Sequence, residues 1–160
     1  MGQTRNLRDG VIKLKDGTGT PLELTLALDM GNLQFTEKVN HIQVKDRGVL
    51  DHTRPGDQEA VALSFGVKVD RVSEASSPYT LRDALKAENS ASAWVTVGNA
   101  WEPYQLIVEF TINDPDTSGS DDETITFNKF HPEEIEFSEG DEFNELQCSG
   151  FSFETKPTYS

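Results

Sequence analysis

The residue types that build disulfide-bonded or metal-dependent folds are scarce in this chain. Cys148 is its single cysteine, which excludes an internal disulfide and leaves cysteine-rich zinc sites without ligands. The three histidines, His41, His52 and His131, lie far apart and share no metalloprotease spacing. No long apolar run is present and the first residues are polar, so we expect neither a signal peptide nor a membrane span. These absences predict a soluble protein made in a reducing compartment.

Motifs of nucleotide-binding and catalytic proteins are also missing. Gly17 and Gly19 begin neither a G-x-G-x-x-G fingerprint nor a P-loop. Cys148 has no basic residue close to it in the sequence, so a buried, inert thiol is its expected state. The many carboxylates would supply a hydrolase pair, but the sequence singles out no two of them. We therefore predict that the chain is not an enzyme and that it holds no cofactor and no metal.

Positive charge is scarce, and the excess of acids is uneven. The chain has 28 acidic and 14 basic residues, a net charge of −14. Residues 113–145 carry 12 acids and one base, Lys129, whereas residues 1–60 are close to neutral. A surface that binds nucleic acid needs Lys and Arg to displace counterions from phosphates, so this composition argues against one. The simplest explanation of such a net charge is that it keeps the protein soluble.

The most regular pattern lies in residues 61–69. Every second residue there is large and apolar, and the residues between them are small or polar. Because side chains alternate between the two faces of a strand, this pattern predicts a strand with one buried and one wet face. The apolar set is Val61, Leu63, Phe65, Val67 and Val69.

The rest of the chain repeats this pattern over shorter stretches. Alternation predicts further strands, the clearest of which cover 22–29, 33–37 and 105–113. Ser77-Pro78 predicts the start of one helix and Asn89 its end. The predicted fold class is mainly β, an antiparallel β-sandwich or barrel with one flanking α-helix. We expect a single domain over residues 1–160, with a mobile N-terminal arm (about 1–8) and C-terminal tail (about 155–160).

An acidic stretch over 114–122 matches part of a calcium-binding loop. Asp114 and Asp116 occupy the first and third EF-hand positions, but the twelfth position is Ile125 rather than Glu, and no helical pattern flanks the loop. A solvated hairpin tip is the favoured interpretation. A looser calcium site stays open, and its ligands would be Asp114, Asp116, Asp121 and Asp122.

Five blocks, in order along the chain, resemble the major tail tube proteins of long-tailed, non-contractile bacteriophages. Each block alone consists only of turn residues and of apolar residues that alternate with polar ones. The resemblance therefore depends on the order and spacing of the blocks, and it spans nearly the whole chain. The blocks are residues 8–21 (RDGVIKLKDGTGTP), 31–37 (GNLQFTE), 46–65 (DRGVLDHTRPGDQEAVALSF), 80–85 (TLRDAL) and 130–137 (FHPEEIEF).

The resemblance implies a β-sandwich or barrel core with one flanking helix, and a structural subunit without an active site. Subunits of that family form six-membered rings, which stack into a hollow tube through which genomic DNA passes without specific binding. The implied partners are further copies of the chain, tail tip and terminator proteins and, before DNA enters, a tape measure protein inside the tube. The implied location is the tail of the virion, after synthesis in the host cytoplasm and without membrane contact. Type VI secretion tube proteins share this fold class.

Carboxylates on the polar strand faces are candidates for the wall of such a tube. A wall lined with carboxylates repels the duplex, whereas basic groups would hold its phosphates and slow its passage. The alternative for each residue is that its strand belongs to an outer sheet and not to the wall of the lumen. The lumen candidates are Glu23, Asp29, Glu37 and Glu109.

Residues 45–58 form a predicted long polar loop that carries charges of both signs. Mixed charge suits complementarity between stacked rings, and a flexible surface loop is the alternative. The candidates for ring stacking are Lys45, Asp46, Arg47, Asp51, Arg54 and Asp57.

A recognition module of the virion is the alternative function. In a monomeric β-sandwich that decorates the particle or binds a receptor, with or without calcium, exposed Trp94, Trp101 and Tyr104 would serve as contact residues. A hydrolase with paired carboxylates is a third function, supported by composition alone.

Overall fold

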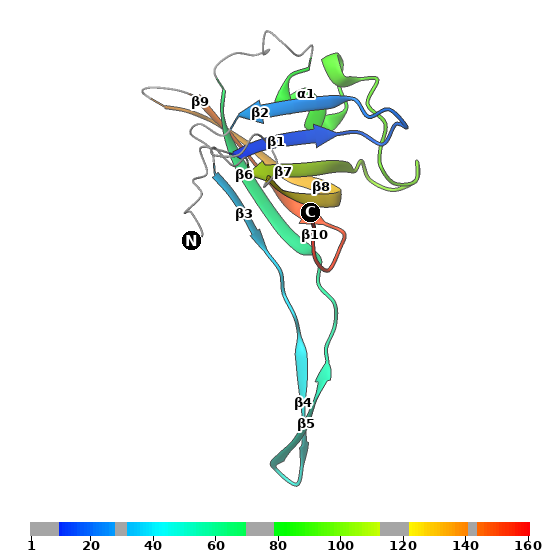
Figure 1. Cartoon of the computed structure of the whole chain (residues 1–160), viewed down its shortest axis with the longest axis vertical. Helices are drawn as coiled ribbons and strands as arrows, with labels where there is room; N and C mark the ends of the chain where they lie inside the picture. The colour runs from blue at the N-terminus through cyan, green and yellow to red at the C-terminus, as the bar shows by residue number, and fades with distance from the viewer. Residues whose placement is uncertain (1–9, 28–31, 70–78, 113–121, 141–143) are drawn as a thin grey trace.

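The computed structural model describes residues 10–27, 32–69, 79–112, 122–140 and 144–160 (Figure 1). One short α-helix, α1 (Leu81–Lys86), and one 3-10 turn, η2 (Asn89–Ala91), accompany ten strands in this part of the chain. The strands are β1 (Gly10–Lys15), β2 (Glu23–Ala27), β3 (Asn32–Thr36), β4 (His41–Asp46), β5 (Val49–Pro55), β6 (Val61–Val69), β7 (Leu106–Ile112), β8 (Glu123–Glu139), β9 (Asn144–Ser152) and β10 (Thr158–Tyr159).

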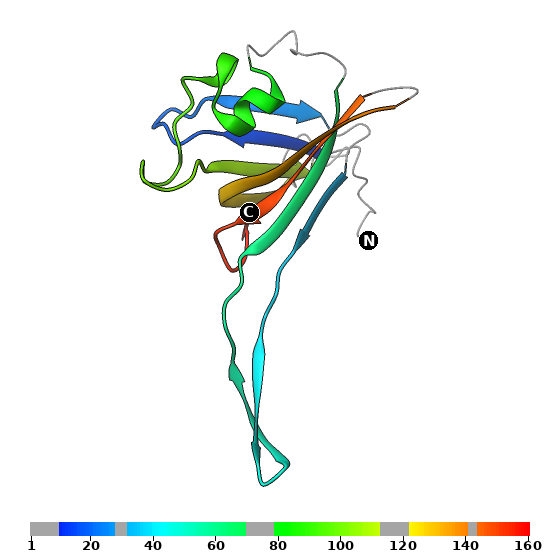
Figure 2. The same ribbon diagram turned by 180° about the vertical axis from the view of Figure 1, so that it is seen from behind.

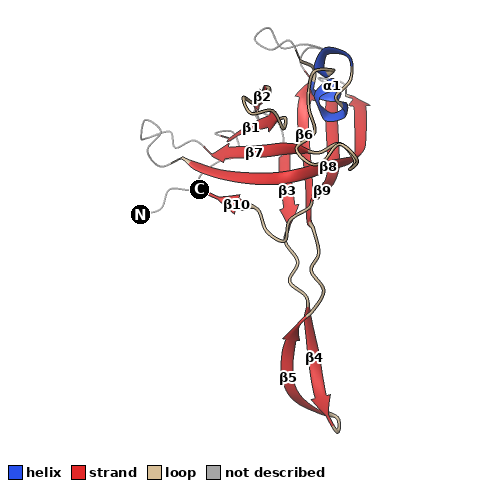
Figure 3. Ribbon diagram, turned by 90° about the vertical axis from the view of Figure 1, so that its right-hand side faces the viewer, coloured by secondary structure: helices blue, strands red, loops and turns tan. Residues whose placement is uncertain are grey.

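All strand pairs are antiparallel, and most belong to one sheet in the order β2-β1-β7-β8-β9-β6-β3. The long strand β8 pairs with β7 through its first half and with β9 through its second, and its register shifts between Pro132 and Glu134. The sheet therefore folds over on itself, and β1, β2 and β7 cross β6 and β9 as a second layer (Figures 1 and 3). The predicted mainly β class with one helix is confirmed.

The core lies between the two layers. In β6, Val61, Leu63 and Phe65 are at most 2% exposed while Ala62 is exposed, as the alternation predicts. The ring of Phe65 lies 6.1 Å from that of Phe130, which comes from β8. Complete burial of such side chains contributes about 1.5–3 kcal/mol each, so this layer contact stabilises the body of the molecule.

The helix starts later than the sequence predicts. Its N-cap is Thr80, whose hydroxyl accepts a hydrogen bond from the backbone N–H of Asp83 at 3.3 Å. Ser77-Pro78, the predicted start, lies outside the described residues. A threonine at the N-cap satisfies one of the free donors of the first turn, which is why the helix begins there.

The helix also ends earlier than predicted. It stops at Lys86, because Ala87 adopts the left-handed conformation (φ 53°) and its N–H bonds back to the carbonyl of Asp83. Asn89, the predicted end, instead begins η2 and donates its side-chain amide to the Asp83 carboxylate at 3.2 Å.

The sequence predicts a loop over residues 45–58. In the structure, most of this segment belongs to a β-hairpin. In the described part of the chain, strands β4 and β5 pair only with each other. They join through a two-residue turn at Arg47 and Gly48, both with positive φ (50° and 82°). Such turns match the twist of antiparallel strands. The hairpin, residues 41–55, projects from the body as an extension of β3 and β6 (Figures 1 and 2). Strand β5 lacks the apolar alternation by which strands are recognised, whereas Ile42 and Val44 of β4 show it.

Candidate assembly surfaces

The outer face of β3, β6, β9 and residues 131–139 of β8 is polar, and we call it the polar sheet face. Its side chains alternate with the buried ones of the same strands. Paired positions across the four strands form rows, one of which runs through Gln34, Ser64, Ser149 and Glu134. A shallow hollow of about 250 Å³ opens on this face. Its polar lining includes Gln34, Ser64, Glu134, Glu136, Gln147 and Ser149.

The two edges of the polar sheet face have free backbone groups. In the described part of the chain, β3 pairs only with β6, and residues 131–139 of β8 pair only with β9. Strand directions alternate across the four strands, so the two edge strands run in opposite directions. Unpaired edges of this kind are templates for pairing with another chain.

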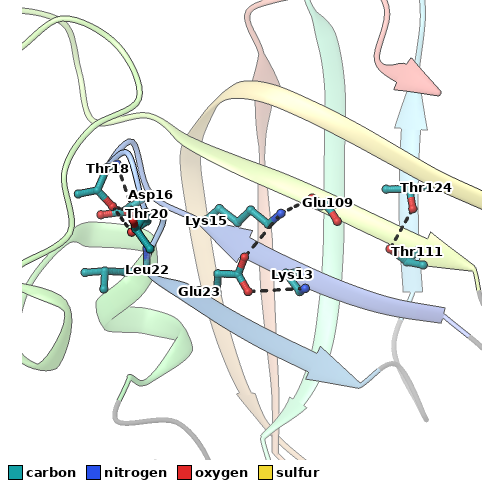
Figure 4. Close-up of polar contacts among 10 residues, drawn as sticks. All are labelled: Lys13, Lys15, Asp16, Thr18, Thr20, Leu22, Glu23, Glu109, Thr111 and Thr124. Carbon is teal, nitrogen blue, oxygen red and sulfur yellow. Dashed lines mark hydrogen bonds and ion pairs between the residues drawn. The ribbon is translucent and has the colours of Figure 1, made fainter. Parts of the chain in front are cut away.

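The outer face of β2, β1 and β7 is different, because its charges are paired within the chain. Lys15 Nζ lies 2.7 Å from Glu109 Oε2 and 3.6 Å from Glu23 Oε1, and Lys13 Nζ lies 3.6 Å from Glu23 Oε2 (Figure 4). The hydrogen bond to Glu109 raises the pKa of Lys15, against the effect of burial, and the charge of Glu23 adds to this rise. We call this surface the ion-paired face.

The predicted lumen carboxylates are distributed over these surfaces. Glu23 and Glu109 lie on the ion-paired face. Glu37 follows β3 and accepts a hydrogen bond from the hydroxyl of Tyr159 at 2.6 Å, and Asp29 lies outside the described residues. No single sheet face brings the set together, and their place in a tube wall stays a prediction.

Sequence reasoning missed carboxylates that the polar sheet face does bring together. Glu134 and Glu136 are alternate residues on the same face of β8, and Glu136 is paired in register with Gln147. The signal is present in the sequence, since Ile135 and Phe137 alternate with them as in a strand. Because acidic residues occur throughout 113–145, composition alone does not show which of them share a strand face.

The predicted stacking residues do lie together, on or beside the hairpin. Lys45, Asp46 and Arg47 are exposed at its tip, and Asp57 is exposed at its base. Arg54 Nε donates to His52 Nε2 at 3.0 Å, and His52 Nδ1 lies 2.6 Å from Asp51 Oδ2. Asp51, His52 and Arg54 therefore form a series of hydrogen-bonded side chains along β5, and the charged residues at the tip stay exposed. Their role in stacking stays a prediction.

The base of the hairpin is tied to the body by polar contacts. The N–H of Gly56 donates to the carbonyl of Asn40 at 2.7 Å, and the amide of Asn40 reaches the carbonyl of Asp57 at 2.9 Å. Lys38 pairs with Glu59 at 3.1 Å. These contacts hold together the two segments that connect the hairpin to β3 and β6.

The aromatic residues expected at a recognition surface do not form one. Trp94 is 5% exposed and packs edge-to-face on Tyr79, so its predicted role as an exposed contact residue is wrong. Tyr104 donates its hydroxyl to the carbonyl of Ala84, and burial raises its pKa. Of the three, Trp101 is the exposed residue, at 82%.

Neither the calcium site nor a reactive thiol gains support. The predicted calcium ligands lie outside the described residues except Asp122, and within the described ranges no three His, Cys, Asp or Glu side chains are grouped to hold a metal. Cys148 is buried as predicted, and burial raises its pKa to about 12. In the same ranges no helix has the length and apolar character needed to cross a bilayer.

Comparison with known proteins gives matches in structure but not in sequence. No family model and no curated protein matches the chain. A chain of the anti-feeding prophage cap, the AFP tube terminating cap, has the same fold with a TM-score of 0.59 at 9% identity, over 100% of this chain and 93% of that one. A chain of an extracellular contractile injection system, the PVC sheath-tube complex in its extended state, gives 0.57 at 6% identity, over 98% and 91%.

A chain of the anti-feeding prophage baseplate, 6-fold symmetrised, gives a TM-score of 0.54 at 9% identity over 100% of this chain and 97% of that one. At such identities the comparisons show a shared fold alone. The protein thus has a tail-tube-like fold, found in components of contractile injection systems, and this fold does not single out the tubes of non-contractile phages.

Proposed function

We propose that this chain is a structural, non-catalytic subunit of a tube in a phage tail or a related injection particle. Copies join side by side into rings through the edges of the polar sheet face, and the rings stack. The joined faces form the wall of a hollow channel. The resemblance in sequence and the shared fold support this role, and the 6-fold symmetry named for one structural neighbour supports six subunits per ring.

The observation that carries the proposal is the opposite direction of the two free edge strands. When β3 of one copy lies beside residues 131–139 of β8 in the next, the alternation of strand directions continues across the contact. Each added copy repeats the same contact, and a closed ring has no free edge left. A four-stranded sheet with two like-directed edges would not continue in this way.

The chemistry of the polar sheet face suits a channel for DNA. Its exposed side chains are small, neutral or acidic, and Glu134 and Glu136 outnumber its base, Lys68. Carboxylates keep phosphates away from the wall, and at physiological ionic strength this repulsion extends about 8 Å. In this arrangement Glu23 and Glu109 lie on the outside of the tube.

Electron microscopy of the purified protein at rising concentration, with light scattering, tests the proposal. We expect rings and hollow tubes whose length grows with concentration. A protein that stays monomeric at every concentration, and also when supplied with a preformed tail tip, would contradict a tube subunit and favour the recognition module.

Labelling of single cysteines tests which face lines the channel. Gln147→Cys places a thiol on the polar sheet face and Thr25→Cys places its control on the ion-paired face, and both native positions are exposed. A bulky polymer-linked maleimide should label both variants as monomers but only Thr25→Cys in tubes. The opposite result would assign the ion-paired face, with Glu23 and Glu109, to the lumen. Cys148 is buried and should stay unlabelled in both.

A further inference from the structure

The hollow in the polar sheet face has a floor and walls of different residues. Its floor is the backbone of residues 64–65 of β6 and 148–149 of β9, because the side chains of Phe65 and Cys148 are buried in the core. The side chains of Ser64 and Ser149 on this floor are small, and longer ones surround them. These longer side chains are Gln34 of β3, Glu134 and Glu136 of β8, and Gln147 of β9.

The lining of the hollow is rich in hydrogen-bond acceptors that the chain itself leaves unused. Gln147 donates its amide to Glu145 at 3.1 Å, which leaves its carbonyl oxygen as an acceptor. Among the described lining residues there is no Lys, Arg or His. The hollow therefore suits a ligand with several N–H donors and a positive charge. The side chains that make no hydrogen bond or ion pair within the described part of the chain are Gln34, Ser64, Glu134, Glu136 and Ser149.

The ion-paired face shows which group satisfies two neighbouring carboxylates in this chain. There the ammonium of Lys15 lies 2.7 Å from Glu109 Oε2 and 3.6 Å from Glu23 Oε1. Glu134 and Glu136 are a similar pair without a lysine from the described part of the chain. Because they alternate along one face of a strand, their Cα atoms are about 7 Å apart. Two ammonium groups on a short alkyl chain can reach both carboxylates.

We propose that the hollow binds a linear polyamine. Its ammonium groups lie on Glu134 and Glu136, and its remaining N–H groups donate to the amide and hydroxyl oxygens around them. A volume of about 250 Å³ is below the range of sites for drug-sized ligands, as a narrow ligand requires. The site belongs to a single copy of the chain and does not depend on the proposed tube.

In a tube the hollow gains a role, because each copy brings one to the channel wall. Carboxylates of the wall repel the phosphates of DNA. A polyamine bound at Glu134 and Glu136 neutralises part of this charge and brings the wall closer to neutral. The charge of the channel then depends on the concentration of polyamine around it.

NMR titration of the ¹⁵N-labelled protein with spermidine at low ionic strength tests the site. The carboxylates are accessible to water, so we expect weak binding, with a Kd of about 1 mM that rises with added salt. The amide signals of residues 64–65, 134–136 and 147–149 should shift and reach saturation. Shifts that do not saturate, or that occur at acidic residues all over the molecule, would overturn the proposal.

Removal of the two charges separates a site from a general effect of net charge. Glu134→Gln with Glu136→Gln should raise the Kd at least about tenfold, because the hollow keeps its shape and loses both ion pairs with the ligand. The matched control is Asp46→Asn with Glu139→Gln, which removes the same charge at two exposed positions outside the hollow. The control should bind spermidine like the unchanged protein. Equal weakening in both variants would contradict the site.

An ammonium group supplied by the chain should replace the ligand. Ser149 is paired in register with Glu134, so Ser149→Lys places a lysine in the hollow. This variant should bind no spermidine, and its Tm should rise at low salt but not at high salt. Unchanged binding of spermidine by Ser149→Lys would mean that the ligand lies elsewhere.

Competition with Mg²⁺ tests whether the site distinguishes a polyamine from any cation. Mg²⁺ keeps most of its water and demands octahedral geometry, so it should displace spermidine poorly at equal charge concentration. Displacement as efficient as that by unlabelled polyamine would show a general response to cations and would overturn the proposal.

The outcomes are independent of the proposed function. A chain that forms tubes but binds no spermidine would lose this inference and keep its role as a tube subunit. A chain that binds spermidine in the hollow but never forms tubes would keep the site and lose the proposed function.

Discussion

The body of the molecule and its hairpin are built on opposite principles. In the body, Val61, Leu63, Phe65 and Val67 of β6 are at most 6% exposed and pack into a core shared by both layers. In the hairpin, β5 exposes every residue, and its large apolar side chains face solvent. A strand needs a buried face to be stable, so the body carries the stability of the chain and the hairpin contributes little to it.

Truncation of a core ring should have the largest effect on stability. Phe127 is 0% exposed, and its ring lies 5.2 Å from that of Phe35 across the two layers. Phe127→Ala should lower the free energy of unfolding by about 3–5 kcal/mol, because it leaves a cavity in the core. Urea denaturation followed by tryptophan fluorescence measures it. A loss below about 1 kcal/mol would contradict a shared core at this position.

Removal of a buried carboxylate should come next. Asp16 is 1% exposed and accepts hydrogen bonds from the N–H of Leu22 (2.7 Å) and the hydroxyl of Thr18 (2.8 Å) (Figure 4). It also accepts one from the N–H of Val95 at 3.1 Å. It thereby ties the β1–β2 turn to a segment far away in the sequence.

Asp16→Ala should lower the free energy of unfolding by about 2–3 kcal/mol, since three partly buried donors lose their acceptor. Urea denaturation again provides the value. Thr18→Val is the matched control, because it removes one donor and keeps the carboxylate. An equal loss in both variants would argue against Asp16 as the centre of this network.

A smaller effect, visible in acid, should follow from Asp83. Burial raises the pKa of its carboxyl, but hydrogen bonds from Ser90, Asn89 and Thr80 outweigh burial and lower the pKa below its ordinary value of 3.8. The carboxylate is thus favoured in the folded state. Its contribution is complete above the unfolded pKa and is lost as pH falls through the folded pKa.

Asp83→Asn should cost about 1 kcal/mol near neutral pH, because the amide replaces a charged acceptor. The difference between the two proteins should shrink below about pH 4, as the carboxyl of the unchanged protein becomes protonated. Thermal unfolding between pH 2 and 7 checks this. A difference that stays constant over this range would show that the charge of Asp83 does not stabilise the fold.

Patterns of burial could be predicted from the sequence, and relations between distant segments could not. The strand over 61–69 and the mainly β class follow from alternation, because a core imposes it on each strand separately. The meeting of Glu134 with Ser149 and Ser64 depends on the bend in β8 and on strand pairing, which no local pattern encodes.

The hairpin shows the other limit of sequence reasoning. Strand β5 has no buried face, and residues 49–55 lack the alternation that marks a strand. Arg47-Gly48 is also an uncommon pair for its turn type, in which Asn-Gly is favoured. The candidate stacking residues nevertheless lie together on or beside the hairpin, because their mixed charge and the length of the polar segment are local features of the sequence.

Replacement of the hairpin should have the smallest effect on stability and a complete effect on assembly. The Asn40–Gly56 hydrogen bond closes its base, so residues 41–55 can be exchanged for an Asn-Gly turn without strain in the body. No core side chain belongs to the replaced segment, and the free energy of unfolding should change by no more than about 0.5 kcal/mol. Electron microscopy should show single rings or monomers but no tubes. Tubes of normal length from this variant would mean that the body alone makes the contacts between rings, and an unfolded variant would mean that the hairpin stabilises the body, which would remove the contrast between the two regions.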